Sequence, residues 1–91
     1  MGKRIIIIEH ARDRIKNRGA NISEVEETIK KGQRYEVRYS IQAKEMVSPY
    51  GKKWQDKFYS QKKIRVIYKE EKNQLIVITV YVYFGKWEDR K

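Results

Sequence analysis

Two β-branched segments in the C-terminal third of the chain place the strongest constraint on its fold. Residues 63–69 read KIRVIYK, residues 74–84 read QLIVITVYVYF, and only the short stretch EEKN separates them. Alternating Ile, Val and Tyr residues are typical of strands, and so short a connection lets the two segments pair as a hairpin. The second segment is apolar or aromatic on both faces, which predicts a strand in the centre of a sheet.

The N-terminal third predicts one strand and two helices. Residues 3–9 (KRIIIIE) are short and β-branched, as strands are. Residues 10–18 predict a short helix, which Gly19 would end. The sequence NISEVEETIKKG predicts a second helix, with Ser23 as its N-cap and Glu26 completing a capping box.

The middle of the chain predicts further strands and one irregular segment. Residues 34–41 alternate between apolar and polar, as in a half-buried strand. Residues 42–53 include the turn signal SPYG and predict a loop, and loops of this length are often functional. Another strand is expected near residues 54–60. The whole pattern predicts a single α+β domain over residues 1–91, with two N-terminal helices packed on one face of a four- to five-stranded, mostly antiparallel sheet.

The charge balance indicates a polyanionic partner. The 91 residues include 22 Lys and Arg against 12 Asp and Glu, which gives a net charge of +10. Nucleic acid is the first candidate, an acidic protein the second and an anionic membrane surface the third. The apolar run at residues 5–8 is too short for a signal peptide or a membrane span, so we expect a cytoplasmic protein with no membrane partner.

The residue types present narrow the possible chemistry. The lack of cysteine excludes disulfides, thiolate metal ligands and cysteine nucleophiles, and a single histidine argues against zinc. The five glycines form no phosphate-cradling motif. We therefore expect neither a metal nor a cofactor, so any catalysis must use the chain's own side chains.

The segment HARDRIKNRG contains the first candidate site. His10, Arg14 and Arg18 are four residues apart, so on a helix they share one face. A helix N-terminus favours anions and a neutral imidazole, and the two arginines can hold a phosphate beside it. This arrangement suits metal-free RNA cleavage. The alternative is structural: the imidazole would cap the helix or bond a strand, and the arginines would pair with glutamates of the second helix.

Arg65 is the second candidate, because it lies among apolar residues of a predicted strand. A guanidinium in such a place needs a partner or an opening to solvent. It can face the first helix and complete a phosphate clamp with Arg14. The alternative is an arginine at the sheet edge that pairs with Glu70 or Glu71.

Aromatic residues interleaved with cations are the third candidate. Trp54 follows Lys52, Lys53 and the SPYG turn, a context that favours stacking on an exposed base. Tyrosines at alternating strand positions are more typical of a core, with the hydroxyl at its rim, and we expect this of Tyr81 and Tyr83.

Taken together, these motifs resemble the family known as domain of unknown function 4258. Its members begin with a His-Ala-x-x-Arg-x-x-x-Arg-Gly helix, continue with an Ile-Ser-x-x-x-Val helix and end in a strand that contains Thr-Val-Tyr. The matching positions in this chain are His10, Ala11, Arg14, Arg18, Gly19, Ile22, Ser23, then Val25 or Glu26, and Thr79, Val80 and Tyr81.

That family resembles, more distantly, the RelE-type and colicin-type ribonuclease toxins. By this resemblance the expected fold is a RelE-like toxin core, RNA is the expected substrate, and an acidic antitoxin protein is an expected partner. The expected activity is a metal-independent endoribonuclease that leaves a 2′,3′-cyclic phosphate. His10 would be the base, or the acid that protonates the leaving group. The phosphate would be held by Arg14, Arg18 and Arg65.

Other residues separate two functional hypotheses. In the enzyme, Thr79 and Tyr81 would position the substrate from the sheet. The alternative is a non-catalytic module that binds nucleic acid or an acidic protein by charge and shape. In that case Lys52, Lys53 and Trp54 would matter more than the histidine, and RNA would be bound without product.

Overall fold

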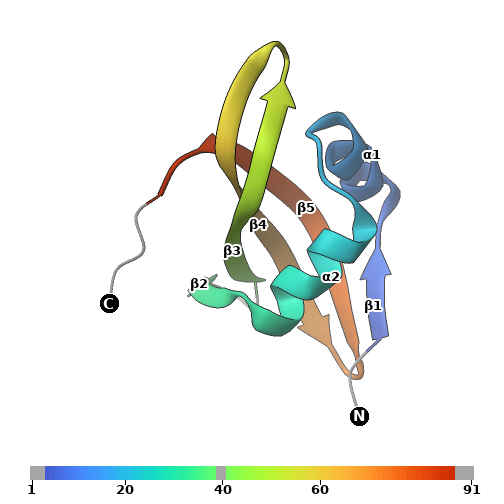
Figure 1. Ribbon diagram of the computed structural model, residues 1–91. Coiled ribbons are helices and arrows are strands. Elements are labelled where there is room, and N and C mark those ends of the chain that lie inside the picture. The colour runs from blue at the N-terminus through green and yellow to red at the C-terminus, as the bar shows by residue number, and fades with distance from the viewer. Residues whose placement is uncertain (1–3, 39–40, 88–91) are drawn as a thin grey trace.

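The computed structural model describes residues 4–38 and 41–87, with only the backbone described for residues 35–38 (Figure 1). Its two helices and five strands form an α+β fold with a mixed sheet, which confirms the predicted fold class. The strand order is β1-β5-β4-β3-β2, in which β1 is parallel to β5 and the other neighbours are antiparallel. The elements are β1 (Arg4–Ile7), α1 (Glu9–Asn17), α2 (Ile22–Lys31), β2 (Gln33–Arg38), β3 (Ile41–Trp54), β4 (Lys57–Glu71) and β5 (Gln74–Gly85).

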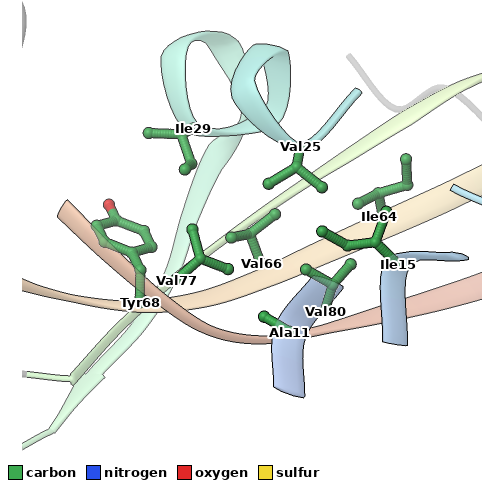
Figure 2. Packing of buried hydrophobic residues seen from close by; sticks show 9 residues of the cluster. All are labelled: Ala11, Ile15, Val25, Ile29, Ile64, Val66, Tyr68, Val77 and Val80. Carbon is green, nitrogen blue, oxygen red and sulfur yellow. The ribbon is translucent and has the colours of Figure 1, made fainter. Parts of the chain in front are cut away.

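Alternation along β4 divides the sheet into two different faces. Ile64, Val66 and Tyr68 are buried, and Figure 2 shows them against side chains of both helices. We call this side the core face. The intervening residues Arg65 and Ile67 lie on the opposite side, which we call the open face. The core cluster consists of Ala11, Ile15, Val25, Ile29, Ile64, Val66, Tyr68, Val77 and Val80.

The second helix begins two residues earlier than its sequence signal suggests. Asn21, not Ser23, is the N-cap of α2, so that prediction is wrong. The Asn21 side chain accepts from the Glu24 N–H at 2.8 Å, and Glu24 Oε1 accepts from the Asn21 N–H at 3.1 Å. Asn caps as well as Ser does, so two overlapping capping patterns competed in the sequence. At the other end, Lys44 Nζ donates to the Ile29 carbonyl at 2.6 Å.

The segment predicted as a loop is part of the long strand β3. Pro49 lies beyond the residues of β3 that pair with β2, so β3 is an edge strand at this position. A proline is tolerated in an edge strand because its missing N–H can face away from the sheet. The register with β4 shifts between Pro49 and Lys52, and Gly51 has φ +62° there. A β-bulge of this kind absorbs an extra residue without ending the strand. The loop prediction for residues 42–53 is therefore wrong.

The strand expected near residues 54–60 is confirmed over residues 57–60, which begin β4, but Gln55 and Asp56 form the turn of the β3–β4 hairpin. Trp54 ends β3, Lys57 begins β4, and Gln55 and Asp56 have φ +52° and +70°. Two consecutive left-handed residues form the tight turn that matches the twist of a hairpin. In Figure 1 this hairpin extends beyond both helices.

The predicted β4–β5 hairpin is confirmed, but β5 is not the central strand. In the strand order, β4 is the central strand. β1 pairs with β5 only from Gln74 to Val77, so from residue 78 onward one side of β5 has no described strand beside it. The cause is the shortness of β1, which gives way to α1 at Glu9. Within the described residues, no helix is long and apolar enough to cross a membrane.

Candidate nucleic-acid interface

One exposed face of α1 carries the only histidine of the chain. His10 and Arg14 are both exposed, and Arg14 Nε donates to His10 Nε2 across a long hydrogen bond of 3.4 Å. Ala11 and Ile15 are buried on the other side of the helix. As the acceptor of this bond, Nε2 presents its lone pair to the Arg14 guanidinium. Ile8 is the N-cap of α1, so the histidine does not serve as one.

Arg18 connects α1 to the free edge of β5. Its Nη1 donates to the Val80 carbonyl at 2.8 Å, and its guanidinium carbon lies 5.0 Å from the centre of the Tyr81 ring. The Val80 carbonyl lies beyond the residues paired with β1, where a backbone acceptor needs another partner. Arg18 therefore reaches around the strand edge toward the open face.

Two of the three glutamates of α2 have cationic partners away from α1. Glu24 Oε2 lies 2.8 Å from Nζ of Lys62, a buried lysine of β4 that also donates to the Gly19 carbonyl at 3.0 Å. Glu27 pairs with Lys31 at 3.4 Å within α2. These contacts tie the α1–α2 turn to the sheet and direct two of the α2 carboxylates away from α1.

Arg65 lies on the open face and does not form the expected clamp with Arg14. Its neighbours Ile64 and Val66 take the core face, so alternation directs Arg65 away from the helices. Its Nε donates to Glu45 Oε1 at 2.9 Å, and its guanidinium carbon is 5.3 Å from the centre of the Tyr83 ring. The expectations that Arg65 faces the first helix, or pairs with Glu70 or Glu71 at an edge, are replaced by this cross-strand pair with Glu45 of β3.

Tyr81 and Tyr83 are surface residues of the open face, not core residues. Tyr81 is opposite Arg65 in the register, Tyr83 is opposite Lys63, and each tyrosine is 40% exposed. Lys63 Nζ also lies 4.8 Å from the centre of the Trp87 ring. We call the three pairs Arg18–Tyr81, Arg65–Tyr83 and Lys63–Trp87 the cation–aromatic band.

Sequence reasoning missed Lys63, Tyr83 and Trp87 as site residues. A signal for the first two was present, because the predicted hairpin between residues 63–69 and 74–84 brings alternating cations opposite alternating tyrosines. Thr79, another predicted site residue, is half-buried and opposite Ile67, also on the open face.

Trp54 occupies a different place from the one that its sequence context predicts. Its ring stacks on Phe84 with centroids 5.0 Å apart, and it packs against Gly19, where an added Cβ would lie 2.9 Å from the indole. Lys52 and Lys53 are exposed near the tip of the β3–β4 hairpin. Trp54 is therefore not part of the cation–aromatic band, and one face of its indole is covered by Phe84.

The described residues contain no group of three or more His, Asp or Glu side chains that could hold a metal ion. The groups that the described surface offers are an imidazole, several guanidinium and ammonium groups, and exposed aromatic rings. Such a surface suits a polyanion that carries aromatic bases.

The fold and this surface define a small α+β protein with a basic, aromatic-rich sheet. The chain belongs to the family described as Domain of unknown function (DUF4258), whose model matches residues 7–82. The match runs from the end of β1 to near the end of β5 and includes His10, Arg14, Arg18 and Arg65. No curated protein and no solved structure gives a significant match.

Proposed function

We propose that this protein binds RNA and cleaves it without a metal, in the manner of the RelE-type and colicin-type ribonuclease toxins that its family resembles. The observation that carries the proposal is the exposed His10 imidazole in contact with the Arg14 guanidinium, on a helix whose next basic residue on that face, Arg18, reaches the sheet. The net charge of +10 supports a polyanionic substrate.

The proposed reaction is attack of a ribose 2′-oxygen on the adjacent phosphorus. His10 Nε2 takes the 2′-hydroxyl proton, the P–O5′ bond breaks, and the 5′-oxygen gains a proton from solvent, which leaves a 2′,3′-cyclic phosphate. A bound phosphate competes for the Arg14 guanidinium and so releases Nε2 from its present hydrogen bond. Arg14 and Arg18 then stabilise the negative charge of the phosphorane.

The same proposal includes a more specific fold, the RelE-like core, and a protein partner. A RelE-like core, with both helices on one face of the sheet, is supported by the single cluster to which α1 and α2 both contribute. An acidic antitoxin protein would match the charge of the α1 surface and compete with RNA for it. Arg65 is no longer assigned to the phosphate clamp, because it lies on the open face.

The test is incubation of RNA with purified protein in chelator, with product ends identified by mass spectrometry. The wild type should produce 2′,3′-cyclic ends. His10→Ala should abolish cleavage and retain RNA binding, and Arg14→Ala should reduce both.

Lys16→Ala is the matched control, because it removes one exposed cation from the same helix on a different face. It should leave cleavage nearly unchanged. If the wild type binds RNA without product, or if His10→Ala cleaves normally, the catalytic assignment is wrong. Binding without product would instead support the non-catalytic module.

A further inference from the structure

The proposed cleavage chemistry uses one cation at the edge of the open face, Arg18, and leaves the rest of that face without a role. Both helices direct their buried residues into the cluster on the core face. On the open face, Val47, Tyr81 and Tyr83 are each about two-fifths exposed (39%, 40% and 40%). Exposed apolar and aromatic groups in one area mark interaction sites on soluble proteins.

The rings on this face are held in place by cations. The distances from cation to ring centre are 5.0 Å for Arg18–Tyr81, 5.3 Å for Arg65–Tyr83 and 4.8 Å for Lys63–Trp87. The Trp87 backbone N–H also donates to Gln61 on β4. Tyr81 and Tyr83 point to the same side of β5, roughly 6.6–6.8 Å apart along the strand. Tyr81 and Tyr83 therefore each have a cation beside the ring while remaining 40% exposed.

We propose that the open face binds single-stranded RNA, with bases stacked on Tyr81 and Tyr83 and phosphates held by the cations of the cation–aromatic band. This inference rests on the proposed function, because it names the form of RNA that the protein would take. Stacking on aromatic side chains needs unpaired bases, and cations beside the rings complement the backbone between them.

The alternation of cations with aromatic rings favours a nucleic acid over a protein partner. A protein interface centre is depleted of charge, whereas here each ring of the band has a cation within 5.3 Å. Duplex RNA is also disfavoured, since its bases are already stacked and its deep, narrow major groove is closed to side chains on the sheet.

Glu45 opposes this binding in a way that can be measured. Its carboxylate lies 2.9 Å from Arg65 Nε and 3.9 Å from Lys63 Nζ, so it offsets part of the positive charge of the band. A phosphate that approaches these cations must compete with that carboxylate. Glu45→Gln should therefore bind single-stranded RNA more tightly, and the dependence of log affinity on log salt should steepen by about 0.7 for each additional phosphate that the protein neutralises.

The experiment is fluorescence anisotropy with a labelled, unstructured RNA of about 12 nucleotides, within the usual site size of such surfaces. The His10→Ala variant serves as the background, so that cleavage cannot alter the probe. Tyr81→Leu and Tyr83→Leu should each weaken binding about tenfold, since each removes the ring on which one base stacks. Tyr81→Phe should retain binding, because it keeps the ring.

Phe58→Leu is the matched aromatic control, because Phe58 is 60% exposed near the β3–β4 turn and is not part of the band. It should bind as the background does. The inference would be overturned if Tyr81→Leu and Tyr83→Leu both bound RNA as tightly as the His10→Ala background, if Glu45→Gln bound RNA more weakly than that background, or if duplex and single-stranded RNA bound equally well. None of these results would argue against the α1 site. No binding of any RNA by the wild type would refute the proposed function itself. Circular dichroism of each variant shows that the fold is retained.

Discussion

Gly19, in the turn between α1 and α2, gives the most direct test of how the helices dock onto the sheet. It has φ +85°, and an added Cβ would lie 2.9 Å from two atoms of the Trp54 ring and 3.2 Å from Phe84. The indole cannot simply swing away, because it stacks on Phe84 at 5.0 Å. Gly19→Ala should therefore be strained twice, once in the backbone and once in packing.

Gly51 separates the two effects. It has φ +62°, but nothing lies within 4 Å of the position that an added methyl group would take. Left-handed backbone costs alanine about 1–2 kcal/mol, and the smaller entropy of the unfolded alanine chain offsets roughly 0.4–1 kcal/mol of this. Gly51→Ala should thus lower the free energy of unfolding by about 1 kcal/mol. Overpacking adds about 1–3 kcal/mol, so Gly19→Ala should lose about 2–4 kcal/mol.

Urea denaturation followed by circular dichroism measures this difference. With the slope of roughly 1–3 kcal/mol/M typical of small proteins, the midpoint of Gly19→Ala should lie about 1 M below that of Gly51→Ala. In a Trp54→Leu background, the two alanine variants should become nearly equal. If they are already equal with Trp54 present, the indole yields without cost and the docking argument is wrong.

Three further predictions concern stability. Asn21→Ala should lower the free energy of unfolding by about 1 kcal/mol, and Ser23→Ala by much less, since Asn21 is the observed N-cap. Urea denaturation midpoints compare the two variants. A larger loss for Ser23→Ala than for Asn21→Ala would refute the cap assignment. Lys62→Met should lower the free energy of unfolding by about 2 kcal/mol in the same assay. This is less than the loss expected for a fully buried ion pair, because Glu24 keeps contact with solvent. An unchanged urea midpoint would contradict this prediction. Burial raises the pKa of Tyr68 above 10.0, although the Arg34 charge lowers it somewhat. The unfolded chain therefore releases this proton first, so stability should fall as pH rises from about 10 through the folded pKa. Tyr68→Phe should reduce that fall, and an identical pH dependence would refute the assignment.

The elements that could be predicted are those whose signals are local. Alternating β-branched residues indicated the β4–β5 hairpin, because side chains alternate across a strand whatever it packs against. The spacing of four between His10 and Arg14 was enough to bring their side chains together on α1, as their hydrogen bond shows. Errors arose where local signals competed. Asn21 and Ser23 both suit an N-cap, and the turn signal SPYG was overridden by pairing with β4.

The sequence by itself determined the α+β class, the identity of the strands in the hairpin and the basic face of α1. Only the tertiary structure decided which side of the sheet shares a buried cluster with residues of both helices, and hence that Arg65 lies on the opposite, open face. It also decided the contact of Arg18 with Tyr81, which are far apart in the chain. Such contacts depend on the end of β1 at Ile7, which leaves the edge of β5 open to a side chain from α1. Local propensity carries no information about that edge, because the edge exists only once the strands are paired.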